Sequence, residues 1–159
     1  INMYQTLIKI RTLLSAVLGN SVNLWVDDPS FVQESSLPLL AIVPISTSVN
    51  IADIQRDSYE FSIDLILIMN AKEELGKYRQ EVIGVQYLTE KMEGKDTTGA
   101  LLVNTILYVI RHNLRLGDNW NITNVGSIEY ANVIRGAQGS QYYTREARLR
   151  LGVMRLKNR

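Results

Sequence analysis

The chain has 159 residues, no cysteine and one histidine, and its 17 Lys and Arg residues nearly balance its 16 Asp and Glu residues. The missing cysteine excludes disulfides, thiolate zinc sites and cysteine nucleophiles, and a single histidine excludes His-rich metal sites and catalysis by a pair of histidines. Hydrophobic residues make up 46% and charged residues 21% of the chain, as is typical of a single globular domain, here expected to span residues 1–159.

The first part of the chain predicts one helix and two short strands. Apolar residues recur at helical spacing from Met3 to Val17, and Gly19 supplies a stop, so we expect a helix over residues 3–18. Short strands are expected at residues 23–26 and 39–45. The apolar run that contains the second strand is far shorter than the ~20 residues of a membrane helix. The amino terminus also lacks the pattern of a signal peptide, so we expect a soluble, intracellular protein with no membrane partner.

Residues 46–57 are mostly polar and predict a loop that projects from the domain. The loop lies between two well-defined strands, so we expect it to reach a neighbouring molecule. Its candidate interface residues are Asn50, Asp53 and Arg56.

A clear strand is predicted at residues 59–69, where apolar side chains alternate from Tyr59 to Met69 on one face. The opposite face begins with Glu60, Ser62 and Asp64 and ends with two isoleucines. This change predicts a strand whose second face is exposed at its start and covered at its end.

The rest of the chain predicts two helices and then strands. The helices are expected at residues 78–92 and from about Leu102 to Ile110, the second capped by Asp96 or Thr98. The strands are expected at residues 120–125, 127–134 and 141–156, with a hairpin turn at residues 135–140. The coarse order α-β-β-β-α-α-β-β predicts an α+β fold with a mostly antiparallel sheet covered by helices.

The balanced net charge conceals a polarised molecule. The last 25 residues hold seven basic side chains and one acid, Glu146, whereas the other 134 hold ten basic and fifteen acidic side chains. In the last strand Ala147, Leu149, Leu151 and Val153 share one face, so that face belongs to the core. The basic residues that we assign to an interface with another molecule are Arg135, Arg145, Arg148, Arg150 and Arg155.

No residue pattern predicts catalysis or the binding of a cofactor or metal. His112 lies near a helix end, where a surface or capping role is the better interpretation, and no Gly-x-Ser-x-Gly motif accompanies it. The acidic pairs fit solvated turns or a helix start, and Asp53 with Asp57 lacks enough ligands for a cation. The glycine-bearing segment 136–139 joins two strands and lacks the lysine of a phosphate loop. We therefore expect a protein that is not an enzyme.

Three interpretations of the basic strand remain open. Tyr142 and Tyr143 beside the arginines suit a platform for single-stranded nucleic acid, although the chain lacks the basic excess of a dedicated nucleic-acid-binding module. Alternatively, the strand meets the acidic helix segment with Glu81, Glu90 and Glu93 in another copy of the chain, giving a head-to-tail contact. The third interpretation is a solvated face without a partner.

The order of elements and the closing segment from Tyr142 to Leu151 resemble the tail terminator proteins of long-tailed bacteriophages. In that segment an aromatic pair and Arg145-Glu146 precede alternating apolar residues, as in the final strand of the family. The resemblance spans essentially the whole chain.

The resemblance implies a structural protein of the virion, made in the host cytoplasm and placed where the tail joins the head. It implies a homohexameric ring that ends growth of the tail tube, with the tail-tube protein and a head-completion or connector protein as partners. DNA would pass through the lumen without sequence-specific binding, guided by few inward charges. A head-completion or neck protein of the same assembly is the alternative.

Overall fold

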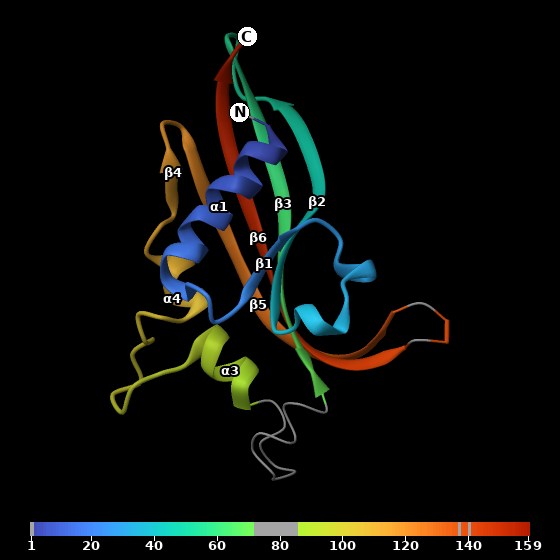
Figure 1. The fold of residues 1–159 in the computed structure, drawn as a ribbon. Coiled ribbons are helices and arrows are strands. Elements are labelled where there is room, and N and C mark those ends of the chain that lie inside the picture. Colours follow the sequence, from blue (N-terminus) through green and yellow to red (C-terminus); the bar gives the residue numbers. More distant parts are fainter. Residues whose placement is uncertain (1, 72–85, 137, 140) are drawn as a thin grey trace.

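The computed structural model describes residues 2–71, 86–136, 138–139 and 141–159 (Figure 1). The helices are α1 (Met3–Leu18), η1 (Pro29–Phe31), η2 (Glu34–Ser36), α3 (Gln86–Glu93) and α4 (Ile106–Arg111). The strands are β1 (Asn23–Val26), β2 (Leu39–Ile51), β3 (Arg56–Asn70), β4 (Arg115–Gly117), β5 (Trp120–Arg135) and β6 (Tyr142–Asn158).

The strands form one curled sheet in the order β1-β2-β3-β6-β5-β4 (Figure 1). Only β1 and β2 are parallel, and the other neighbours are antiparallel. The predicted α+β class with a mostly antiparallel sheet is therefore confirmed. The predicted order roughly agrees, but the number and placement of the helices differ in detail. Within the described residues, the structure adds the short strand β4 and the two turns of 3₁₀ helix.

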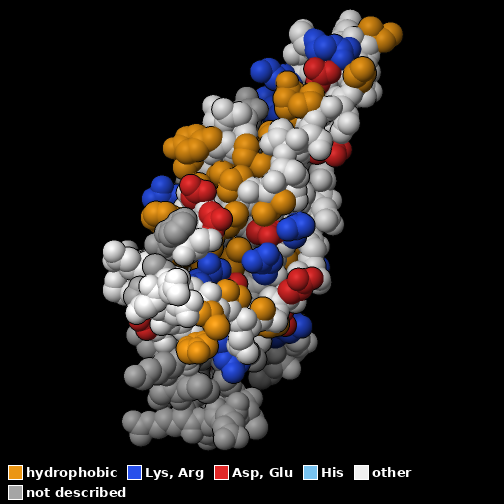
Figure 2. Space-filling view, turned by 90° about the vertical axis from the view of Figure 1, so that its right-hand side faces the viewer, with side chains coloured by type: hydrophobic (Ala, Val, Ile, Leu, Met, Phe, Trp, Pro, Cys, Tyr) orange, Lys and Arg blue, Asp and Glu red, His pale blue; other side chains and the backbone are white. Residues whose placement is uncertain are grey.

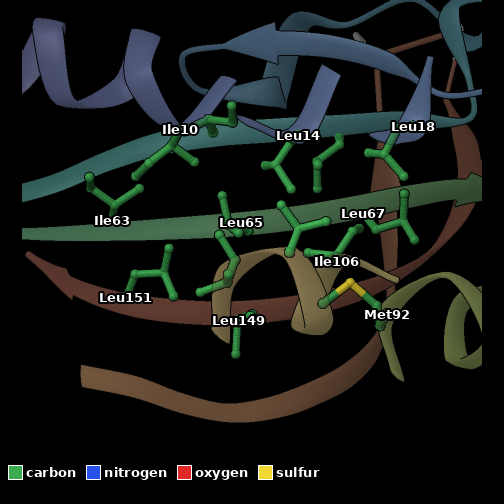
Figure 3. Packing of buried hydrophobic residues seen from close by; sticks show 14 of the residues in the cluster. Ile10, Leu14, Leu18, Ile63, Leu65, Leu67, Met92, Ile106, Leu149 and Leu151 are labelled. Atoms are coloured by element: carbon green, nitrogen blue, oxygen red, sulfur yellow. The ribbon is translucent and has the colours of Figure 1, made fainter. Parts of the chain in front are cut away.

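The long helix α1 packs on one face of the sheet, called here the helix face. Its amino terminus is fixed by a capping box between Asn2 and Gln5, and Gly19 ends it at a φ of 57°. Ile10 and Leu14 are fully buried and point toward Ile63 and Leu65 of β3 (Figure 3). The helix bounds were predicted correctly, but Val17 was wrongly placed on the buried stripe, since it is 39% exposed.

The opposite face of the sheet, called here the open face, is covered by the described residues only at one end. There the segment with η1 and η2 packs Val32 against Leu39, Ala41, Ile66 and Ile68. Toward the other end of β3, Ser62 is half-buried and Glu60 is exposed. The predicted change along the second face of β3 is confirmed, because the short helical segment shields only its last residues.

The prediction of a loop at residues 46–57 is wrong. β2 continues to Ile51 and β3 begins at Arg56, so most of the segment is the distal half of a β-hairpin that projects at one end of the sheet (Figure 1). Polar residues on both faces suggested a loop. Here they lie on a strand that reaches beyond the helices, so both faces meet solvent.

The other boundaries differ in detail. α4 begins at Ile106 with Thr105 as its cap, so the predicted caps Asp96 and Thr98 were wrong; Asp96 instead accepts hydrogen bonds within its own turn. The two strands expected between residues 120 and 134 are one strand, β5, with two register irregularities against β6. Of the helix predicted at residues 78–92, residues 86–92 are helical, and the part before residue 86 lies outside the described residues.

Which face of α1 is buried can be tested by removing side-chain volume from either face. Replacing Leu14 with Ala should lower the free energy of unfolding by about 2–5 kcal/mol, because the side chain is fully buried. Replacing the exposed Val17 with Ala should change it by less than about 0.5 kcal/mol. Urea denaturation followed by circular dichroism measures both values, and equal losses would contradict the described packing.

Candidate interface surfaces

A buried carboxylate lies at the middle of the open face. Asp64 of β3 is opposite Arg150 of β6, and only 1% of its side chain is exposed. The Arg150 guanidinium donates from Nε to Oδ1 at 2.8 Å and from Nη2 to Oδ2 at 3.1 Å. These hydrogen bonds and the charge of Asp64 raise the pKa of Arg150 above its usual value. Arg148 adds a weaker contact, with 3.6 Å between Nη1 and Oδ2.

The two arginines therefore neutralise a buried acid of their own chain. Their side chains remain 45% and 54% exposed, so they still form part of the surface. The sequence placed them correctly on the face opposite Leu149. It missed Asp64 as their partner, although a single acid within the apolar half of β3 is a signal that a buried charge needs a counter-ion.

A second ion pair lies closer to the η1–η2 segment. Arg135 of β5 donates from Nε to Oε1 of Glu146 at 2.7 Å, and both side chains are almost fully buried. Nearby, the Tyr142 hydroxyl donates to the Val32 carbonyl. Arg135 thus forms a buried ion pair within the domain, and its side chain offers little surface to a partner.

The remaining predicted interface residues lie at separate places. At the hairpin turn, Arg56 Nε donates to Asp53 Oδ2 at 2.7 Å. This hydrogen bond is the largest cause that lowers the pKa of Asp53. Asn50 is exposed nearby on β2. Arg155 donates to the Asp118 carbonyl at the β4–β5 turn. Arg145 lines a separate hollow of about 390 Å³ together with Tyr143 and Ile134. The structure therefore gathers Arg148 with Arg150 on the open face and Asp53 with Arg56 at the hairpin turn, and it leaves Arg135, Arg145 and Arg155 apart from both groups.

The open face beyond Asp64 is polar and shallow. Two adjoining hollows of about 300 and 270 Å³ share Asn124; the first extends across β2, β3, β6 and β5, and the second lies along β5 and β6. Gly126 and Gly152 lie there at positions with little room for a side chain, because a Cβ atom on either would meet a neighbour at 3.2 Å. Figure 2 shows the resulting mixture, with acidic and basic side chains interspersed over one side of the molecule.

The outer edge of β2 lacks a strand partner along most of its length. β1 pairs with β2 only from Leu39 to Ile42, and no other described strand continues this edge to Ile51. None of the 13 residues of β2 is charged. Ile45, Val49 and Ile51 are exposed, the last at 78%. Edge strands are usually protected by charges, prolines or bulges, and here only Pro44 and the irregularity after it do so.

The opposite side of the sheet has a second free edge. β4 pairs with β5 only through Trp120 and Asn121, so within the described chain β5 has no outer strand partner from residue 123 to Arg135. The sequence could not reveal either edge, because the predicted strand ended at residue 45 and the order of strands in the sheet was unknown.

No protein-family model and no curated protein matches this chain. Among the helices that the structure describes, none is long and apolar enough to cross a membrane. The described His, Asp and Glu residues form no group of three or more that could hold a metal ion.

The role of Arg150 can be separated from that of Arg148 by matched substitutions. Arg150→Met should lower the free energy of unfolding by about 1–3 kcal/mol, because the buried Asp64 loses two hydrogen bonds. Arg148→Met should lower the free energy of unfolding by less than about 1 kcal/mol, since the contact of Arg148 with Asp64 is longer and its side chain is half-exposed. Chemical denaturation at pH 7 measures both, and an equal cost would argue against the bidentate geometry.

Proposed function

We propose that this chain is a tail terminator of a long-tailed bacteriophage. It forms a homohexameric ring that ends growth of the tail tube and joins the tail to the head connector. The observation that carries the proposal is the pair of free strand edges on opposite sides of one sheet. An edge on each side lets every copy bind two neighbours head to tail, and such contacts close into a ring when the rotation permits.

The strand directions are compatible with edge-to-edge contact. The strands β2, β3, β6 and β5 are successive antiparallel neighbours, so β2 and β5 run in opposite directions. A copy rotated about an axis along the strands would present its β2 antiparallel to the β5 of its neighbour. The free part of β2, residues 43–51, is level with residues 150–157 of β6, whereas that of β5, residues 124–135, is level with residues 142–152, so the two overlap only at residues 150–152. The strands would therefore tilt to the ring axis, as strands do in closed barrels.

The chemistry of the open face supports its assignment to the lumen. With α1, α3 and α4 on the other face, the polar surface is free to line a channel. Arg148 and Arg150 are already paired with Asp64, so they add few uncompensated contacts to phosphate. Because DNA affinity grows with each neutralised phosphate, this surface suits passage of DNA without tight binding. The pairing of these arginines with Asp64 favours a ring component over a nucleic-acid-binding module.

Native mass spectrometry and negative-stain electron microscopy test the ring directly. We expect six copies of the 18.0 kDa chain around a central opening. Adding the chain to growing tubes of the tail-tube protein from the same genome should stop their elongation. Tubes that elongate unchanged would contradict the terminator role, and rings without that activity would favour a head-completion or neck protein.

The edge contact is tested by adding charge to β2. Replacing Thr47 and Val49 with Lys should shift the chain from hexamer to monomer, because lysines on an exposed edge oppose strand pairing. The control is Ile54→Lys, which places the same charge in the hairpin turn, outside the strand. Sedimentation velocity reads the assembly state. A doubly substituted chain that still sediments as a hexamer would exclude β2 from the interface.

A further inference from the structure

The free edge of β2 has an apolar face and a polar face. Val49 is paired with Tyr59, which packs against the core under the helices, so Val49 belongs to the helix face. Ile51 follows two residues later on the same side. These two side chains are 55% and 78% exposed. Ser48 and Asn50 alternate with them and therefore point to the open face, where Ser48 lines the larger of the two polar hollows.

The free edge of β5 shows a similar division. Ile128 and Tyr130 are paired with core residues of β6, so both belong to the helix face. Ile128 is partly buried against the core, and Tyr130 is 37% exposed. The Tyr130 hydroxyl donates to the Glu93 carboxylate of α3 at 3.2 Å, which holds the ring on the side of the helices. Glu129 lies between them and points to the open face, together with its pairing partner Arg148.

A head-to-tail ring keeps the faces of neighbouring sheets in line. A rotation carries each copy onto the next, so the helix face of one β2 continues the helix face of the neighbouring β5. Residues opposite each other on paired strands share a face, and their side chains lie about 5 Å apart. The face of each residue is already fixed by its own domain. Val49 can therefore lie opposite Ile128 or Tyr130, but it cannot lie opposite Glu129.

The levels of the two free segments fit a tilted ring. Their midpoints differ by about six residues of β6, which is roughly 20 Å along the strands. The repeat from one β2 to the next spans β2, β3, β6 and β5, about 19 Å across the sheet. Together these lengths give a strand tilt of about 45°, close to that of closed barrels. At this tilt the free segments overlap, and the partner that shares the face of Val49 is Ile128.

We propose that Val49 of one copy packs between Ile128 and Tyr130 of the next copy, and that Ile51 extends this contact along the strand. The contact rests on the proposed ring and assigns the side chains that join its subunits, beyond the backbone hydrogen bonds of the paired edges. It continues the apolar core of the helix face from one subunit to the next. The four side chains are uncharged, so burial of apolar surface drives the contact and the open face stays polar.

Engineered cysteines test the contact directly, because the native chain has none. Val49→Cys combined with Ile128→Cys places both thiols on the helix face. Mild oxidation should then produce covalent ladders of up to six copies on a denaturing gel, since opposite residues on paired strands lie within disulfide range. Ile128 also touches the core, so a second variant combines Val49→Cys with Tyr130→Cys. The control combines Val49→Cys with Glu129→Cys, whose thiols point to opposite faces, and it should stay largely monomeric on the gel.

Alanine substitutions measure the strength of the contact. Val49→Ala with Ile51→Ala should weaken association at least about tenfold, because apolar surface is no longer buried between copies. The control is Ser48→Ala with Asn50→Ala, which shortens two side chains of the same strand on the open face and should change association less than about threefold. Sedimentation velocity provides the readout. Native association should change little with added salt, since salt screens charges and the contact contains none.

The outcomes separate this contact from the ring itself. A native hexamer would overturn the contact and leave the ring standing if both alanine variants assemble equally well and the cysteines on the helix face cross-link no better than the control. A native chain that stays monomeric at every concentration would overturn both.

Discussion

Strands β3 and β6 pair without a register shift from Arg56 opposite Asn158 to Asn70 opposite Thr144, and the other elements are placed relative to this pair. The pairing fixes which side chains share a face, because a slip of one residue would exchange the two faces. Leu65 and Leu149 thereby join the apolar core beneath the helices on one face, while Asp64 and Arg150 meet on the other. The continuous ladder also carries the hairpin beyond the last contact with the helices.

The two faces of this pair obey different physical constraints. The helix face is stabilised by burial of apolar side chains from α1, α3, α4 and the sheet. The open face contains Asp64 at a position as deeply buried as its apolar neighbours, so it requires a cation from the same chain. Arg150 meets this requirement while its outer surface stays in water. A cationic strand is thus compatible with a nearly neutral surface, and charge counts along the sequence overstate the attraction for an anion.

Sequence periodicity predicted the helix at residues 3–18 and the two-sided character of β3, because burial imposes a period of 3.6 on a helix and of 2 on a strand. It placed Arg148 and Arg150 on the correct face for the same reason. It failed for residues 46–57, where neither face is buried and no period distinguishes a strand from a loop. It also missed the Asp64 pair, since Asp64 and Arg150 lie far apart in the sequence and meet only because β3 and β6 are neighbours in the sheet.

The uncharged β2 strand has a consequence for the chain before it meets any partner. Ser46 to Ile51 combine β-branched residues with no charge and no proline, which is the composition of segments that stack into cross-β aggregates. Pro44 and the irregularity beside it limit this stretch to six residues. In the proposed ring, a newly made chain would therefore face competition between ordered assembly and aggregation, with an outcome that depends on how quickly its neighbours are synthesised.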